Sequence, residues 1–153
     1  MTTTKAIFDT FTIERAYRAT PQKIYAAFQD PAKKRRWFAE GEGWIVLQYD
    51  LDFRVGGSET SRFKFGEAGP EVRNDCVYFD IVPDSRMVFG YSMSMEGGPF
   101  SVSLGTLELS ATGDRTTLVY TETTTYLNGE NGGKDRKTGS VQLFEALARE
   151  LGE

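Results

Sequence analysis

Apolar and polar residues alternate with a period of two over most of the chain, and this pattern limits the possible folds more than any other feature. A period of two is typical of β-strands with one buried and one exposed face. Between residues 44 and 126, turn-forming residues such as Gly97-Gly98-Pro99 divide the pattern into short segments. Short connections favour antiparallel pairing of neighbouring strands. The expected strands are Trp44–Tyr49, Ser58–Phe65, Val72–Val82, Met87–Met95, Phe100–Ser110 and Thr116–Tyr126.

Two helix starts precede this run of strands. A first alternating segment, Thr10–Arg18, is followed by Thr20-Pro21, where threonine can cap a helix and proline fits its first position. Asp30-Pro31 repeats the device. These signals predict a first strand followed by two short helices.

The end of the chain has a helical rather than an alternating pattern, since Phe144, Leu147 and Leu151 are spaced to share one helix face. The whole order of elements predicts one α+β domain over residues 1–153, a helix-grip arrangement in which a curved antiparallel sheet of about seven strands surrounds a long C-terminal helix. One helix cannot fill the concave face of such a sheet. We therefore expect a cavity between the helix and the sheet.

The composition excludes several kinds of chemistry. The 153 residues include no histidine and a single cysteine, Cys76, which excludes Ser-His and Cys-His nucleophile pairs, an internal disulfide and a thiolate zinc site. We expect no metal and no cofactor. A balance of 18 basic and 22 acidic residues gives a net charge of −4, which disfavours nucleic acid as a partner. No apolar run reaches the length of a signal peptide or a membrane span, so we expect a cytoplasmic protein, monomeric or homodimeric.

Short motifs follow one another in a characteristic order along nearly the whole chain. They are Arg15 before Ala19-Thr20-Pro21, Asp30-Pro31 before Trp37, Arg54-Val55-Gly56-Gly57, the segment Asp80–Val88, Thr106–Leu109, Thr117-Leu118, and Gly139 at the start of the last helix. Their order resembles the START-like helix-grip superfamily, which includes the major birch-pollen allergen. More narrowly, it resembles the bacterial homologues of the activator of the heat-shock-protein-90 ATPase. The resemblance implies the fold, and it implies functions as diverse as ligand carriers, polyketide cyclases, hydrolases, dehydratases and co-chaperones.

The chain departs from this family's usual pattern at three places. Ser140 stands where a tryptophan commonly follows the helix glycine, Cys76 stands where a glycine is usual, and Lys33–Arg36 replaces an apolar residue. The first change removes a large ring, so the cavity is not expected to have the family's usual shape. A run of four cations on a short helix is expected to form a solvated face.

Aromatic and methionine side chains are the candidates for the cavity wall. In Met87–Met95 every second residue is large and apolar, and methionine adapts to varied ligand shapes. The alternative is a solid core in which these side chains pack against one another. The expected ligand-binding residues are Phe63, Phe65, Phe79, Tyr91, Met93, Ser103, Tyr120, Glu122, Tyr126, Ser140 and Leu143.

Glu122 is the main candidate for chemistry. Counting by twos from Leu118 and Tyr120 places Glu122 on the inner face, where a carboxylate needs partners. Arg15 has the inward parity on the first strand, which lies beside the last strand in this fold, so we expect a Glu122–Arg15 ion pair. The pair is either structural or ligand-orienting. Alternatively, Glu122 is the acid/base of an enzyme, with Arg15 and Tyr120 as further catalytic candidates.

Three weaker features complete the expectations. The alternation breaks near Gly105, which predicts a β-bulge that turns Ser101 and Ser103 inward. Asp50 and Asp52 point the same way on a strand and could bind a cation, but solvated carboxylates are the more common case. The acidic neighbour of Cys76 disfavours the thiolate, so we expect an unreactive thiol.

Three hypotheses of function follow from these features. The leading one is binding of a small apolar or aromatic molecule between the sheet and the C-terminal helix. The second is a cofactor-independent cyclase, dehydratase or hydrolase that uses Glu122 in the same cavity. The third, which comes from the family resemblance, is a co-chaperone that contacts a chaperone through its surface. Neither a nucleic acid nor a membrane is expected as a partner.

Overall fold

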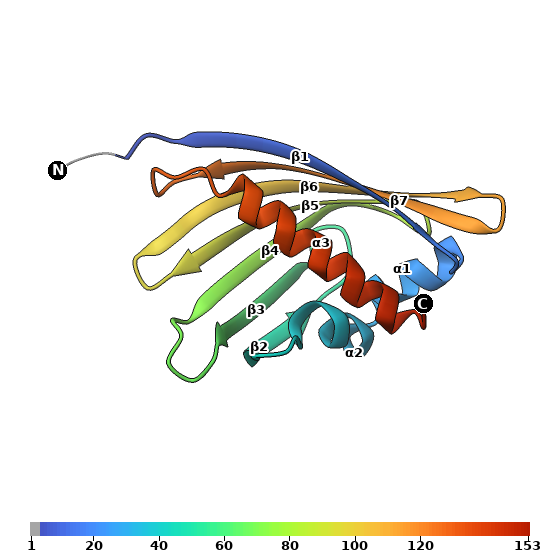
Figure 1. Cartoon of the computed structure of the whole chain (residues 1–153), viewed down its shortest axis with the longest axis horizontal. Helices are drawn as coiled ribbons and strands as arrows, with labels where there is room; N and C mark the ends of the chain where they lie inside the picture. Colours follow the sequence, from blue (N-terminus) through green and yellow to red (C-terminus); the bar gives the residue numbers. More distant parts are fainter. Residues whose placement is uncertain (1–3) are drawn as a thin grey trace.

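The computed structural model describes residues 4–153 and contains one seven-stranded antiparallel sheet. The strands lie in the order β1-β7-β6-β5-β4-β3-β2, and the helix α3 crosses one face of the curved sheet (Figure 1). The predicted α+β helix-grip architecture is therefore confirmed. The elements are β1 Ile7–Tyr17, α1 Pro21–Gln29, α2 Pro31–Lys34, the π-helical turn η1 Arg35–Ala39, β2 Trp44–Leu51, β3 Ser58–Phe65, β4 Val72–Val82, β5 Arg86–Met95, β6 Gly98–Thr112, β7 Arg115–Tyr126 and α3 Gly133–Glu150.

Both proline-initiated helices begin where the sequence predicts. The Thr20 hydroxyl accepts a hydrogen bond from the Lys23 amide at 3.2 Å, and the Asp30 carboxylate accepts one from the Ala32 amide at 2.9 Å. These side chains satisfy amide groups that have no partner within the helix. The π-helical turn that follows α2 brings the Trp37 indole under α1, where it donates to the Ala27 carbonyl at 2.9 Å.

The expected bulge at Gly105 is wrong. The register of β6 and β7 runs unbroken from Ser101 opposite Tyr126 to Thr112 opposite Arg115, so Ser101, Ser103 and Gly105 face inward without it. Of the apolar residues that suggested a break, Val102 and Leu104 lie half-exposed on the convex face, whereas Leu107 and Leu109 are buried. Gly105 has a steric role instead, because a Cβ there would lie 2.8 Å from the Phe89 ring and from the Tyr120 hydroxyl.

The last helix begins six residues before Gly139, the residue at which the family resemblance places its start. It starts at Gly133, whose amide donates to the Asn131 carboxamide at 2.9 Å. A side chain at Gly133 would collide with Asp9 of β1, because its Cβ would lie 2.1 Å from a carboxylate oxygen. The earlier start lengthens α3 by six residues, which is less than two turns, and places Arg136 over the sheet. Within residues 4–153 no helix is long and apolar enough to cross a membrane.

The hydrophobic core lies at one end of the molecule. Tyr17, Ile24, Leu118 and Leu147 are fully buried where α1, the end of β1 and the second half of α3 meet the sheet. The Tyr17 hydroxyl donates to the Phe144 carbonyl at 2.9 Å and so ties β1 to α3. Because the core supports only the second half of α3, the first half spans a concave region of the sheet that is not filled by side chains.

Candidate functional site

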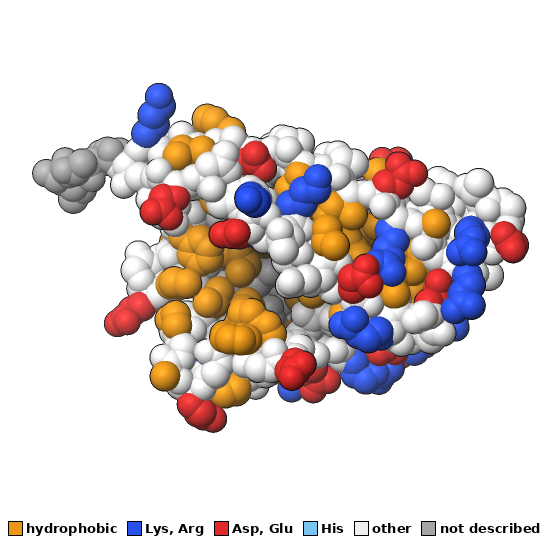
Figure 2. Space-filling view, viewed as in Figure 1, with side chains coloured by type: hydrophobic (Ala, Val, Ile, Leu, Met, Phe, Trp, Pro, Cys, Tyr) orange, Lys and Arg blue, Asp and Glu red, His pale blue; other side chains and the backbone are white. Residues whose placement is uncertain are grey.

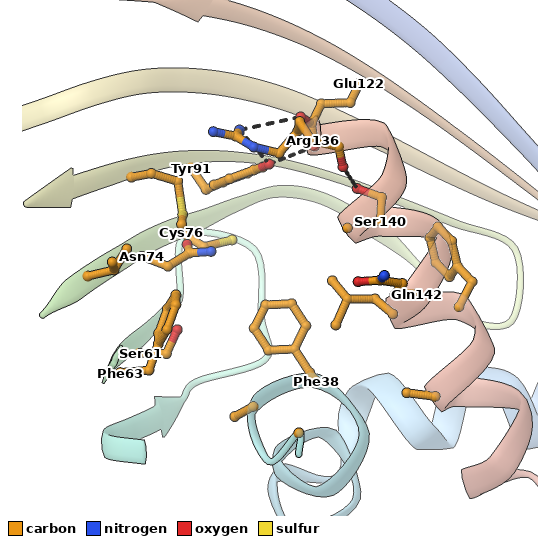
Figure 3. A pocket seen from close by; sticks show the side chains of 18 of the residues that line it. Phe38, Ser61, Phe63, Asn74, Cys76, Tyr91, Glu122, Arg136, Ser140 and Gln142 are labelled. Carbon is orange, nitrogen blue, oxygen red and sulfur yellow. Dashed lines mark hydrogen bonds and ion pairs between the residues drawn. The ribbon is translucent and has the colours of Figure 1, made fainter. Parts of the chain in front are cut away.

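A cavity of about 1230 Å³ lies between α3 and the concave face of the sheet. Its mouth is visible as a hollow beside α3 in which apolar side chains gather (Figure 2). The wall is built from β3, β4, β5 and β7 on one side and from η1 and α3 on the other, with Phe38 projecting between them (Figure 3). The aromatic residues of the lining are Phe28, Trp37, Phe38, Trp44, Phe63, Tyr78, Phe89, Tyr91, Phe100, Tyr120, Tyr126 and Phe144.

Glu122 lies at one end of this cavity and is 1% exposed. One carboxylate oxygen accepts hydrogen bonds from the hydroxyls of Tyr91 and Tyr120, each at 2.7 Å. The other oxygen accepts from the Thr124 hydroxyl at 3.0 Å and lies 3.6 Å from the Arg136 guanidinium. The inward orientation of Glu122 predicted from strand parity is thus correct, and its carboxylate is fully satisfied by protein donors.

The expected ion pair between Glu122 and Arg15 is wrong. Glu122 lies opposite Phe11 on β1, whereas Arg15 lies opposite Leu118, about 13 Å further along the strand. Arg15 does face the inner side, but it pairs with the exposed Glu145 of α3. Strand parity gave the correct face for both residues but could not give the distance between them. Arg15 is therefore not part of this site.

Arg136 of α3 takes the place expected for Arg15. Its guanidinium donates to the Tyr91 hydroxyl at 3.1 Å (Figure 3). It also donates to the Ser103 hydroxyl at 3.2 Å and to the Ser101 hydroxyl at 2.8 Å. The sequence did not point to Arg136 because the last helix was expected to start at Gly139, three residues after it. The pair of inward serines on β6 was the available signal, since two small hydroxyls on a concave face leave room for a long polar side chain.

The tyrosines around Glu122 stay protonated. Burial raises the pKa of Tyr91, and the nearby negative charge of Glu122 raises it further. The same two causes, in the same order, raise the pKa of Tyr120 well above its ordinary value. Both hydroxyls therefore act as donors to the carboxylate over the physiological pH range.

A second buried carboxylate lies at the other end of the cavity. Glu59 of β3 accepts hydrogen bonds from the Tyr49 and Tyr78 hydroxyls, each at 2.6 Å, and from the Lys34 ammonium at 3.1 Å. The expectation that Lys33–Arg36 is a solvated run is wrong for Lys34, which is 5% exposed. Its ammonium lies 4.5 Å from the centre of the Phe38 ring. The turn from α2 into η1 points this one cation inward.

The signal for the second cluster was present in the sequence. Counting back by twos from Phe63, which faces the cavity, places Ser61 and Glu59 on the same inner face of β3. A carboxylate at that position requires a buried partner. One of the four cations in Lys33–Arg36 is this partner, but the sequence of a short helix does not indicate which one.

Most of the expected ligand-binding residues lie in the cavity wall. Ser103 is buried behind the wall, where it contacts Arg136 and Thr124. Tyr126 has a buried hydroxyl with no hydrogen-bond partner in the part of the chain that the structure describes. The expected residues that line the cavity are Phe63, Tyr91, Met93, Tyr120, Glu122, Tyr126, Ser140 and Leu143.

Phe79 and Phe65 lie outside the cavity, contrary to expectation. Phe79 is 59% exposed on the convex face, because the inward residues of β4 are Cys76 and Tyr78. Both parities of this strand carry apolar residues, so alternation alone gave the wrong face. Phe65 is 61% exposed at the end of β3, and its ring packs edge-on against Trp44 at 5.1 Å.

Cys76 has a buried thiol in the cavity wall. Burial raises its pKa to about 12, with a further contribution from the charge of Glu59. Burial, rather than the neighbouring Asp75 carboxylate, is therefore the main reason why the thiol stays protonated. That carboxylate instead accepts from the Arg73 guanidinium at 2.7 Å.

The acidic pair considered for a cation does not form a site. Asp50 accepts from the Gln48 amide at 2.6 Å, and Asp52 accepts from the Arg54 guanidinium at 2.9 Å. Across residues 4–153 no group of three or more cysteine, aspartate or glutamate side chains is arranged to hold a metal ion.

The helix-grip sheet, the crossing helix and the cavity between them define a class of protein, and comparison with protein families narrows that class. Residues 18–152 match the family described as Activator of Hsp90 ATPase homolog 1-like protein. The chain belongs to this family, as the motif order predicted. A comparison with curated proteins finds no match.

Solved structures of bacterial proteins share the whole architecture. The Mll3558 protein from Rhizobium loti is 47% identical, with a TM-score of 0.88 over 95% of this chain and 99% of its own. An uncharacterized protein from Rhizobium leguminosarum is 32% identical, with a TM-score of 0.91 over 97% of each chain. The AHSA1-like protein from Aeromonas hydrophila, at 17% identity and a TM-score of 0.68 over 94% of this chain and 92% of its own, shares the fold.

Proposed function

We propose that the protein binds one small, mainly apolar or aromatic molecule in the cavity between α3 and the sheet. The observation that carries this proposal is a ring-lined space of about 1230 Å³ that opens to the surface. Ligand sites of this size are mostly apolar, with a few polar groups that fix orientation. The wall here is mostly apolar, and the two carboxylate clusters lie at its ends.

The state of Glu122 supports binding over acid/base catalysis. A general base needs a lone pair directed at the substrate proton. Here the carboxylate already accepts from three hydroxyls and lies beside a guanidinium, so its oxygens are directed at protein donors. The cluster is suited to holding a wall of hydroxyl groups in fixed positions, which is a ligand-orienting role.

Dye binding tests the proposal. We expect an uncharged environment-sensitive dye such as Nile red to bind with a dissociation constant near the micromolar range, about 8 kcal/mol of affinity. Met93→Trp places a large ring in the cavity wall and should weaken binding at least tenfold. The matched control is Met95→Trp, on the same face of β5 but outside the lining, which should leave the affinity unchanged. Equal effects of the two variants would contradict the proposed site.

Native mass spectrometry of freshly purified protein distinguishes the remaining hypotheses. A retained small molecule that is released unchanged on denaturation supports binding. Conversion of that molecule during incubation would favour the cyclase, dehydratase or hydrolase hypothesis. If neither a dye nor a natural molecule binds, the cavity has no ligand, and the co-chaperone function suggested by the family description becomes the hypothesis to test.

A further inference from the structure

The geometry points to a ligand that carries hydrogen-bond-accepting oxygens at both ends of a flat, uncharged ring system. This inference rests on the proposed function and adds to it the chemical class of the ligand. It comes from a likeness between the two polar clusters, which lie on different strands and different helices. In each cluster a buried carboxylate accepts from two tyrosine hydroxyls and pairs with one cation. The clusters are Glu122 with Tyr91, Tyr120 and Arg136, and Glu59 with Tyr49, Tyr78 and Lys34.

The carboxylates keep little acceptor capacity for a ligand. Glu59 accepts three hydrogen bonds at 3.1 Å or less, and Glu122 accepts three at 3.0 Å or less. The tyrosine hydroxyls donate their hydrogen bonds to these carboxylate oxygens. What remains at each end is the unused donor capacity of the cation.

Lys34 has unused donors at the Glu59 end. An ammonium carries three N–H groups, and this one donates a hydrogen bond only to Glu59 among the described residues. The other side of the ammonium faces aromatic rings, with Phe38 at 4.5 Å and Phe28 at 5.2 Å from the ring centres. Lys34 lines the cavity, so a ligand oxygen that enters beside these rings meets an ammonium that lacks acceptors.

Arg136 and Tyr126 have unused donors at the Glu122 end. The guanidinium uses its two terminal nitrogens, while its Nε–H has no hydrogen-bond partner within residues 4–153. The Tyr126 ring lies 5.5 Å from the guanidinium carbon, and its buried hydroxyl has no partner among those residues. A buried donor left without an acceptor is costly, so an oxygen atom from a ligand would satisfy this end.

The distance between the two ends suits a short ring system. Phe89 lies between them, with its ring centre 6.0 Å from that of Tyr78 and 6.1 Å from that of Tyr120. Two such steps, one from Tyr78 to Phe89 and one from Phe89 to Tyr120, connect a tyrosine of one cluster with a tyrosine of the other. A molecule of about three fused rings would cover that span along the apolar wall.

Charge balance selects an uncharged ligand. Each cation is already paired with a carboxylate, at 3.1 Å for Lys34 and at 3.6 Å for Arg136. A ligand with an ionised group at each end would bring two uncompensated charges into a buried site, which is unfavourable. Carbonyl or neutral phenolic oxygens accept hydrogen bonds without that cost. The ligand class is therefore a neutral ring system with ketone, quinone or hydroxyl oxygens at opposite ends.

Three matched ring compounds test this inference by titration at pH 6, where their hydroxyls are neutral. They are 2,6-dihydroxyanthraquinone with an oxygen at each end of its long axis, 2-hydroxyanthraquinone with one, and anthraquinone with none. We expect affinity to rise about tenfold with each terminal oxygen, since hydrogen bonds to charged groups are stronger than neutral ones. Equal affinities for the three compounds would overturn the inference while leaving the proposed cavity function intact.

Variants assign the effect to the cations. Lys34→Met should abolish the advantage of the dihydroxy over the monohydroxy compound, whereas Lys33→Met, one residue earlier and outside the lining, should preserve the advantage. The double variant Lys34→Met/Glu59→Gln, which strands no charge, makes the same test if the single variant does not fold. An advantage that survives loss of Lys34 overturns the inference. Failure of both the anthraquinones and Nile red to bind would overturn the proposed function itself.

Discussion

At the scale of single residues, Glu122 stabilises the fold through the donors it accepts. In Glu122→Gln, the amide group presents N–H donors where hydroxyls now donate, and the charge of Arg136 loses its partner. Breaking a buried pair in this way costs about 3 kcal/mol. We expect a fall of that size in the free energy of unfolding, measured by urea denaturation.

The partner of Glu122 can be identified by a double-mutant cycle. Arg136→Met combined with Glu122→Gln should recover part of the loss, because neither charge is then stranded. Arg15→Met is the matched control, since its pair with Glu145 lies at the surface and is worth less than about 1 kcal/mol. Coupling of Glu122 to Arg15 rather than to Arg136 would contradict the site described here.

The buried thiol gives a pH-dependent prediction. Because its pKa is about 12 in the folded protein, Cys76 is almost entirely protonated at pH 8. An unfolded cysteine has a pKa near 8.5, so reaction with a disulfide reagent should be on the order of a thousandfold slower in the folded state. The folded state holds this proton more tightly. Its contribution to stability is therefore full below about pH 8.5 and is lost as the pH rises toward 12. Rapid labelling of the native protein at pH 8 would contradict this picture.

At the scale of elements, β6 and α3 depend on two glycines in opposite ways. Gly105→Ala should destabilise the protein by about 1–3 kcal/mol, because the new methyl group would overlap the Phe89 ring and the Tyr120 hydroxyl. Gly139→Ala should stabilise it by about 1 kcal/mol, since alanine favours the helix and a Cβ there meets no atom within 4 Å. Thermal unfolding of both variants measures these changes, and a stable Gly105→Ala protein would show that the wall around Phe89 is loosely packed.

The elements also show how far the sequence alone could predict this structure. The strand boundaries and both proline-initiated helices follow from local rules of alternation and capping, so they were predictable to within a few residues. The side of β4 that faces the cavity was not predictable, because apolar residues occupy both alternating sets of positions in this strand. The partners of Glu122 and the inward turn of Lys34 depend on contacts between residues distant in the sequence, and local patterns do not contain that information.

At the scale of the whole molecule, the core and the cavity divide α3 into two parts. The core residues of α3 all lie in its second half and are Phe144, Leu147 and Ala148, whereas its first half carries Arg136, Gly139 and Ser140 in the cavity lining. Stability is not uniform in such a structure, and segments with few apolar contacts open first. We therefore expect amide hydrogens of the first half to exchange faster than those of the second half.

A ligand should change this difference in a defined way. A molecule present at about 100 times its dissociation constant stabilises the native state by about 2.7 kcal/mol, and the melting temperature should rise with its concentration. In hydrogen exchange followed by mass spectrometry, protection should increase in the first half of α3 and in β5, which face the cavity, and change little in β1, which contributes to the core and not to the lining. Met93→Trp, which binds the ligand more weakly, should show a smaller rise in melting temperature and less protection at the same ligand concentration. Protection that increases equally in β1 and α3 would place the ligand outside the cavity, because a molecule held between the sheet and α3 contacts α3 and not β1.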